Sequence, residues 1–261
     1  MAICHVTSPE ETKMPSTAAE LLLAARRDPS QRLAALPEAL KPADRAAAYK
    51  IQAEIAKSFG AIGGWKVSPF GADAPPMCGA LPAATIVPSP AKIAPDAACM
   101  RGVEAEVCVR MGRDLPPRAT PYTSDEVIAA IASMHPVIEV LDSRYLEVGR
   151  VDQPSNIADS QSHGGLVYGA GITDWQGIDL AKETMQQHVD GALDASKTGM
   201  PGGDLIGEVV WLANEGSVWA GGLKAGQFVT CGSWSGANRV GPKAKVKVVF
   251  STVGETMVEY G

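Results

Sequence analysis

The spacing of apolar and polar residues predicts helices in the first part of the chain. Thr17 and Glu20 flank two alanines as a capping box, which opens an amphipathic helix rich in alanine and leucine. This helix is expected to end near Asp28, because a proline follows it. A second helix is expected to carry Pro42 in its first turn, where proline has no helical hydrogen bond to lose. These residues indicate a small helical region at the N-terminal side of the chain.

After Gly64 the pattern changes to short β-rich runs separated by proline and glycine, which is typical of strands joined by turns. Two further helices are expected within this part, over residues 127–134 and 205–220. We therefore predict an α+β fold in two parts. A helical cap over residues 1–62 precedes a β-rich domain over residues 63–261.

Two carboxylates interrupt an otherwise apolar run. Glu104 and Glu106 lie two residues apart, so on a strand both side chains point to the same face while their apolar neighbours point to the other. Two adjacent carboxylates repel each other unless a proton or a cation neutralises them, and Mg²⁺ prefers such oxygen ligands. A half-exposed strand with glutamates on its wet face produces the same alternation.

A second apolar run offers a third acid. Glu139 and Asp142 both lie in this run, three residues apart, and therefore on opposite faces of a regular strand. Either of them could complete a site with three carboxylates, but both together could not. The spacing alone leaves this choice open.

One lysine lies at the start of an apolar strand rather than on a solvated helix. Lys66 follows Gly64 and Trp65, which places a cation where it could meet an anionic substrate. The alternative is a lysine that extends from the strand end into water. Asp73, which follows it in the chain, has by default the character of a turn residue.

The overall composition excludes some classes of partner. The chain has 261 residues, a net charge of −6 and no run of five like charges, which argues against binding of nucleic acid or an anionic membrane surface. No basic segment followed by an apolar one is present at the start, so no signal peptide is expected. The five cysteines form no C-x-x-C pair, as expected for reduced thiols. We expect a cytoplasmic protein.

Taken in order, these segments resemble the 2-oxopent-4-enoate hydratase branch of the fumarylacetoacetate hydrolase superfamily, whose decarboxylase relatives act on 4-oxalocrotonate. The resemblance extends over nearly the whole chain. The segments that carry it are 64–66, 73–75 with Gly79, 101–106, 112–117, 136–144, 159–165, 223–226 and 230–233.

The resemblance assigns roles to individual residues. It implies that Glu104, Glu106 and Glu139 bind the metal, which favours Glu139 over Asp142; the latter would then point away and pair with Arg144 or Arg101. The catalytic residues would be Lys66, Asp73 as an acid or base, and Ser162. The residues expected to bind the substrate are Ser233, where the family commonly holds the substrate carboxylate, together with Gly232 and Leu81.

Two segments depart from the family pattern. The family often reads G-x-K-x-G, but Ser68 stands at the last glycine. It often reads D-N-A-S, whereas this chain has the sequence DSQS over residues 159–162. The superfamily's hydrolases use a histidine–glutamate pair, which is not evident here. The substrate, or even the reaction, could therefore differ from those of the family.

The resemblance implies a hydratase that requires Mg²⁺ or Mn²⁺. It would add water to a 2-hydroxy-2,4-dienoate, or its 2-oxo-4-enoate form, through a metal-stabilised enolate, as in the meta-cleavage catabolism of aromatic compounds. The alternative is a metal-dependent decarboxylase of a 2-oxo diacid such as 4-oxalocrotonate. A further alternative is a homologue that binds metal and 2-oxo acids without turnover. A homo-oligomer is also expected.

Overall fold

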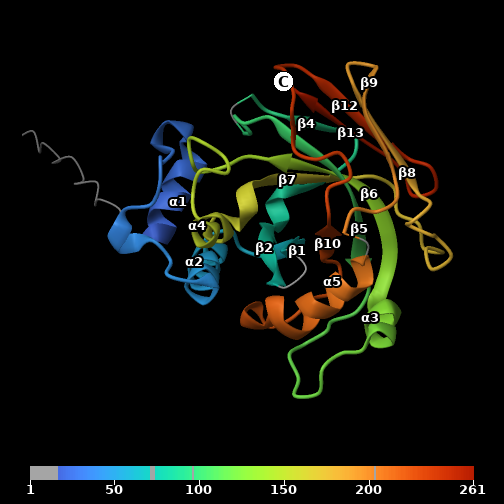
Figure 1. Cartoon of the computed structure of the whole chain (residues 1–261), viewed down its shortest axis with the longest axis horizontal. Coiled ribbons are helices and arrows are strands. Elements are labelled where there is room, and N and C mark those ends of the chain that lie inside the picture. Colours follow the sequence, from blue (N-terminus) through green and yellow to red (C-terminus); the bar gives the residue numbers. More distant parts are fainter. Residues whose placement is uncertain (1–16, 71–73, 96, 203) are drawn as a thin grey trace, which may run out of the picture.

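The computed structural model describes residues 17–70, 74–95, 97–202 and 204–261. Two β-sheets form its centre, with helices at one side and below the larger sheet (Figure 1). The larger sheet has the strand order β2-β1-β10-β5-β6-β7-β3, with β11 paired to β5; the smaller has the order β4-β13-β12-β8-β9. Strands of the larger sheet are β1 (Ile62–Phe70), β2 (Ala74–Pro82), β3 (Ile86–Pro88), β5 (Gly102–Met111), β6 (Ile131–Leu141), β7 (His163–Tyr168), β10 (Phe228–Cys231) and β11 (Asn238–Arg239). Strands of the smaller sheet are β4 (Ala91–Ile93), β8 (Thr184–Val189), β9 (Ala192–Thr198), β12 (Lys245–Phe250) and β13 (Gly254–Tyr260).

The α-helices are short and lie in two groups (Figure 1). One group, α1, α2 and α4, packs beside the larger sheet, and the other, α3 and α5, lies at the opposite end of β5 and β6. Their bounds are α1 Ala18–Arg27, α2 Arg45–Lys57, α3 Ser124–Ala130, α4 Gln153–Ala158 and α5 Leu205–Trp211. Among the described helices, none combines the length and the apolar character needed to cross a bilayer.

The helical region expected near the N-terminal side is confirmed. The capping box of Thr17 and Glu20 is formed at the start of α1, which ends at Arg27. The place predicted for Pro42 is wrong, because α2 begins at Arg45, with Asp44 as its N-cap. The Asp44 carboxylate accepts a hydrogen bond from the N–H of Ala47 in the first turn. Asp44 therefore caps the helix, and Pro42 lies before the cap.

Two helix boundaries in the β-rich part also differ from expectation. The helix predicted over residues 127–134 ends at Ala130, and Ile131 begins β6, which pairs with β5 on one edge and β7 on the other. A strand buried on both faces has no alternation, so its apolar run looks the same as a buried helix. The helix predicted over residues 205–220 is an α-helix only to Trp211. A wider π turn over Leu212–Gly216 and a tighter 3₁₀ turn over Val218–Ala220 follow it.

Two apolar clusters underlie these elements. The larger cluster lies between the sheets and under α5, and the smaller joins α1 and α2 to Tyr145 and Ile157. The side chain of Gln52, only 1% exposed, connects α2 to β2 and α4 by hydrogen bonds to the backbone of Cys78, Ala80 and Ile157. The helical cap is therefore bound to the sheet by polar as well as apolar contacts. The predicted division into two domains at residue 62 stays a prediction.

The larger sheet is strongly curved. Lys66 on β1 and Glu139 on β6 are separated by β10 and β5, which in a flat sheet corresponds to roughly 14 Å. Their side chains nevertheless meet, with 2.7 Å between Lys66 Nζ and Glu139 Oε2. The sheet therefore curls toward this face, and side chains from four neighbouring strands converge in its hollow.

Candidate functional site

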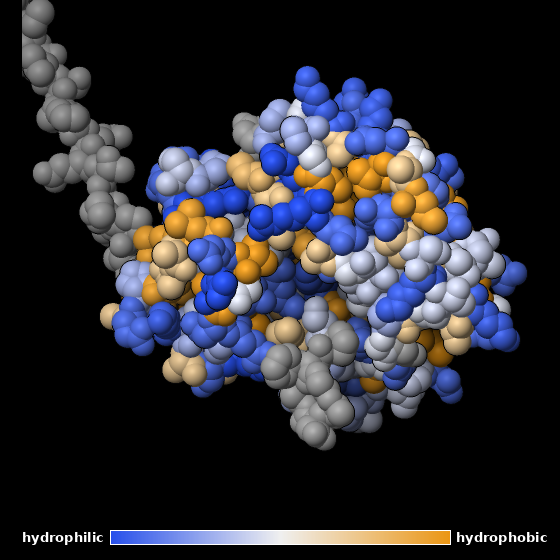
Figure 2. Space-filling view, turned by 45° about the horizontal axis from the view of Figure 1, so that its top comes forward, coloured by the Kyte–Doolittle hydropathy of each residue, from blue (hydrophilic) through white to orange (hydrophobic). Residues whose placement is uncertain are grey.

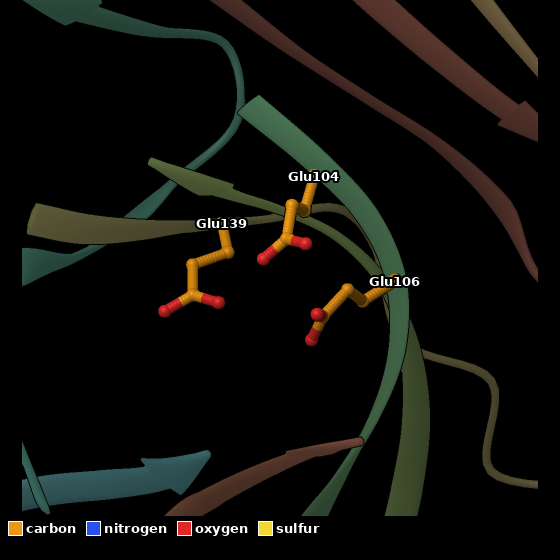
Figure 3. A group of neighbouring side chains, drawn as sticks. All are labelled: Glu104, Glu106 and Glu139. Carbon is orange, nitrogen blue, oxygen red and sulfur yellow. The ribbon is translucent and has the colours of Figure 1, made fainter. Parts of the chain in front are cut away.

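Three carboxylates converge on the concave face of the larger sheet. Glu104 and Glu106 extend from β5, and Glu139, directly opposite Glu104 in the register, extends from β6. Figure 3 shows all three side chains pointing into the same space from the bent strands. One carboxylate oxygen of each lies within 4.8 Å of the others, which is the spacing of ligands around a single cation. We call these three residues the acid cluster.

Burial makes the ionised form of the three carboxylates in the acid cluster unfavourable. Glu139 is fully buried and Glu106 is 4% exposed. Burial, together with the other two carboxylates, raises the pKa of Glu106 well above its usual value. Burial likewise raises the pKa of Glu104 and Glu139, although Lys66 opposes the rise in both. One lysine therefore neutralises only part of the charge that three carboxylates bring.

Lys66 lies inside the acid cluster rather than at the water surface. Its Nζ donates to Glu139 at 2.7 Å and to the backbone oxygen of Gln161 at 3.2 Å. Burial acts to lower the pKa of Lys66, but the charges of the three glutamates outweigh it and raise that pKa. The interpretation of Lys66 as a strand-end lysine extending into water is wrong.

Two neighbours of the acid cluster lie in segments that carry the resemblance but were not predicted as site residues. Thr230 lies beside Lys66 on the parallel strand β10, and its hydroxyl donates a hydrogen bond to the Glu106 carboxylate. His163, which is fully buried, lies with Nδ1 3.1 Å from Glu139 Oε1 and Nε2 3.0 Å from Thr85 Oγ1. Burial, then the nearby cations Arg26, Lys66 and Arg144, hold the pKa of His163 well below its usual value, so the ring is neutral. The spacing of the histidines did not predict this contact, which depends on the pairing of β6 with β7.

The turn that precedes His163 has an unusual backbone. Ser160, Gln161 and Ser162 are all left-handed, with φ values of 48°, 54° and 63°. Each such non-glycine residue costs of order 1–3 kcal/mol and persists only where the surroundings hold it. The backbone oxygen of Ser162 accepts a hydrogen bond from the N–H of Asp142 at 2.8 Å, which fixes the end of the turn to β6.

An arginine cluster holds this turn through the Asp159 carboxylate and two backbone oxygens. Arg144, 2% exposed, forms an ion pair with Asp159 and also donates to the backbone oxygens of Asp159 and His163, both at 2.8 Å. Arg26 of α1 donates to the same His163 oxygen at 3.1 Å. The pairing expected for Asp142 is wrong, because its partner is Arg32. We call Arg26, Arg32 and Arg144, with Asp142 and Asp159, the arginine cluster.

A cavity of about 420 Å³ opens beside the acid cluster. Lys66, Glu104, Gln161 and Ser162 line its charged inner end. Figure 2 shows a recess on this face of the molecule, with hydrophilic residues in its depth. The remaining residues that line the cavity are Ser68, Met77, Leu141, Val148, Gly149, Val151, Gln153 and Asn156.

The other expected site residues lie in different surroundings. Ser233 lies next to Glu104, and its hydroxyl is buried. Gly232 has a φ of 68°, a conformation in which glycine is favoured. The Leu81 side chain is buried in an apolar cluster with Val137 and is absent from the cavity lining. Asp73 falls outside the described residues. The roles of all these residues stay predictions.

Comparison with known proteins gives relatives of the expected kind. No family model matches the chain. A 4-oxalocrotonate decarboxylase from a Pseudomonas species is 29% identical over 164 residues, which cover 59% of this chain and 61% of that protein. A 2-hydroxyhexa-2,4-dienoate hydratase from Comamonas testosteroni is 30% identical over 139 residues, which cover 50% of this chain and 48% of that protein. The chain thus spans less than two thirds of the length of these curated relatives.

A solved structure extends the comparison to the fold. The 4-oxalocrotonate decarboxylase from Pseudomonas putida G7, complexed with magnesium and adipate, superposes with a TM-score of 0.71. It is 24% identical, and the match covers 84% of this chain and 86% of that one. The α+β fold expected from the motifs is confirmed. The resemblance to the hydratase and decarboxylase branch is also confirmed, since the two curated relatives bear these two names.

Proposed function

We propose that this protein is a divalent-metal-dependent enzyme that adds water to a 2-hydroxy-2,4-dienoate. The observation that carries the proposal is the convergence of Glu104, Glu106 and Glu139 around one space, with a single lysine among them. The names of the curated relatives support the class of chemistry, which in both involves small unsaturated acids.

The acid cluster has the donors that Mg²⁺ or Mn²⁺ would require. Both ions prefer oxygen ligands, and three buried carboxylates with one ammonium leave an excess of negative charge that a divalent cation would neutralise. When bound, the cation would act as a Lewis acid toward the oxygens of a 2-oxo acid. The Ser233 hydroxyl beside Glu104 would help to hold the carboxylate of that acid.

Lys66 would then carry the proton. Its pKa is raised by the charges of the three glutamates, whereas its burial acts in the opposite direction. Once those charges are neutralised, the lowering effect of burial on the pKa of Lys66 would meet less opposition, which would ease proton transfer from the ammonium. In the reaction a proton is added to C5 of the dienoate while the 2-hydroxyl loses one. Water then adds across C3 and C4, with hydroxyl on C4 and hydrogen on C3.

The lining of the cavity favours the hydratase over the decarboxylase. Among its described residues Lys66 is the sole cation, and that lysine is already paired with Glu139. The groups farther from the acids are apolar or neutral amides, such as Met77, Val151 and Asn156. A second carboxylate on the substrate would meet amide donors there but no cation, so part of its desolvation cost would remain. A monoacid with a short, uncharged tail fits these surroundings better than a 2-oxo diacid.

The first test is spectrophotometric. Purified protein with Mg²⁺ or Mn²⁺ is expected to remove the ultraviolet absorbance of 2-hydroxypenta-2,4-dienoate and to form 4-hydroxy-2-oxopentanoate, and a chelator should stop the reaction. Release of CO₂ from 4-oxalocrotonate, without hydration of the dienoate, would show the decarboxylase instead. Absence of both reactions from protein that binds metal would contradict the proposal and favour a binding protein without turnover.

A pair of variants separates catalysis from metal binding. Lys66→Met should retain Mn²⁺ but lose most turnover, because the proton carrier is gone while the carboxylates remain. Lys197→Met, at an exposed lysine outside the cavity lining, serves as the matched control and should retain both. Normal turnover in Lys66→Met would contradict the role of the lysine.

A further inference from the structure

One polar group in the cavity lacks a partner among the described residues. The side-chain nitrogen Nε2 of Gln161 is buried and meets no hydrogen-bond acceptor in the described chain. The residue is 7% exposed and lines the inner end of the cavity with Lys66, Glu104 and Ser162. A buried amide donor without an acceptor is unfavourable, so an acceptor from a ligand would be strongly preferred there.

A strained backbone conformation positions the side-chain amide of Gln161. Gln161 is the middle residue of the left-handed turn, and its own carbonyl oxygen accepts a hydrogen bond from Lys66 at 3.2 Å. Its main chain therefore contacts the proposed proton carrier, while its side chain lines the cavity. Arg144 holds both ends of the turn through Asp159 and the carbonyl of His163. Strain retained in this way at a cavity is a feature of sites that position a ligand.

The sequence departure falls on the same residue. In the D-N-A-S pattern of the resembled family the third position is alanine, and in this chain Gln161 occupies it. The asparagine of the second position is replaced by Ser160. The chain has thus lost one amide from this turn and gained another, one residue farther along and one methylene longer.

We propose that the Gln161 side chain donates a hydrogen bond to a carboxylate or carbonyl oxygen of the bound 2-oxo acid and thereby strengthens its binding. This inference rests on the proposed function, because it assumes that the cavity takes such an acid beside the metal. Gln153, also in the lining, donates to Met77 Sδ at 3.9 Å, whereas the buried amide of Gln161 has no acceptor among the described residues.

The test measures ligand affinity separately from turnover. Wild-type protein loaded with Mn²⁺ is titrated with pyruvate, the smallest 2-oxo acid with an uncharged tail, and the affinity for Mn²⁺ is measured in parallel. Gln161→Met keeps the length of the side chain but removes both donors, and should weaken pyruvate binding by about tenfold. The affinity for Mn²⁺ should stay within about twofold, and Gln176→Met, at an exposed glutamine outside the cavity lining, should leave both affinities unchanged.

A second variant covers the possibility that methionine does not fold in a left-handed turn. Gln161→Asn keeps the amide in a residue that tolerates this conformation, but shortens its reach, and should also weaken pyruvate binding. Wild-type affinity for pyruvate in either folded variant overturns the inference, as does a wild-type protein that binds Mn²⁺ but no pyruvate. A wild-type protein that binds both yet hydrates no dienoate overturns the proposed function alone, since the affinities still report on Gln161.

Discussion

Two clusters of charge meet at the turn from Asp159 to His163, and they differ in how their carboxylates are partnered. In the arginine cluster, three guanidinium groups meet two aspartates and the backbone oxygens of the turn. In the acid cluster, three carboxylates meet one ammonium and one threonine hydroxyl. His163 belongs to both, since its ring contacts Glu139 while its carbonyl oxygen accepts from Arg144 and Arg26.

The difference distinguishes a structural charge network from a functional one. In the arginine cluster each carboxylate has its own guanidinium and Arg26 donates to a backbone oxygen, so removal of Arg32 or Arg144 would leave a carboxylate without its partner. A buried cluster with excess charge is unfavourable until something of opposite charge binds. The arginine cluster therefore fixes the turn, and the acid cluster, beside the cavity, remains available for a cation. Opposite responses to mutation should make this contrast measurable.

The largest effect is expected from removal of one carboxylate of the acid cluster. Glu106→Ala should lower the affinity for Mn²⁺ by about a hundredfold or more and abolish turnover, because one ligand and its charge are lost. Titration calorimetry with Mn²⁺ measures the first effect and the dienoate assay the second. Retained metal affinity would remove Glu106 from the proposed set of ligands.

The next largest effect concerns the arginine cluster, where a substitution should lower the stability of the fold rather than the affinity for metal. Arg144→Met should reduce the free energy of unfolding by about 3–5 kcal/mol, because Asp159 would be left buried without its partner. The same change should lower turnover, since the turn that carries Gln161 and Ser162 loses its support. Urea denaturation measures stability, and Arg150→Met, at an exposed ion pair with Glu147, is the matched control. A stable Arg144→Met protein would show that the turn is held by other contacts.

A glycine between the two clusters should show a moderate effect. A Cβ atom at Gly79 would lie 2.9 Å from the carbonyl oxygen of Ser160 and 3.2 Å from Cγ of Lys66. Gly79→Ala should therefore cost about 1–3 kcal/mol of stability and displace the lysine, with a larger loss of turnover than of metal affinity. Gly177→Ala is the control, because nothing lies within 4 Å of the added atom. Equal effects of the two substitutions would show that the turn has room to move.

The smallest expected effect is the pH dependence of the metal-free protein. Burial raises the pKa of Glu106 above its value in the unfolded chain, so the folded state binds this proton more tightly. Its contribution to stability is complete below the unfolded pKa, about 4.3, and is lost as the pH rises through the higher folded pKa. Urea denaturation in the presence of a chelator should therefore show falling stability over that range.

A variant without the titrating group should reduce this fall in stability with rising pH. Glu106→Gln removes the titrating group, so its metal-free form should depend less on pH and be more stable at neutral pH than the wild type. Addition of Mn²⁺ should stabilise the wild type most where the carboxylates are ionised. A wild type that becomes more stable with rising pH, with chelator present, would contradict the idea of an acid cluster with excess charge.

Much of the site could be predicted from local patterns. The alternation around Glu104 and Glu106 predicts that they share a face, and the structure places them so on β5. Spacing alone could not choose between Glu139 and Asp142; the resemblance favoured Glu139, and the register of β6 opposite β5 places it across from Glu104. The boundary of the helix that ends at Ala130 was missed, because strand pairing overrides local preference there.

The sequence by itself determined the α+β class, the paired carboxylates and the lysine, because capping boxes and alternation act over a few residues and need no partner far away in the chain. The tertiary structure alone decided the curvature that joins Lys66 to Glu139, the contact of His163 with that carboxylate, and the left-handed turn that holds Gln161. These features depend on residues 15 or more positions apart, which come into contact only when the strands pair and the buried arginines bind their aspartates. These contacts form only in the folded molecule, so a local pattern of residues does not predict them.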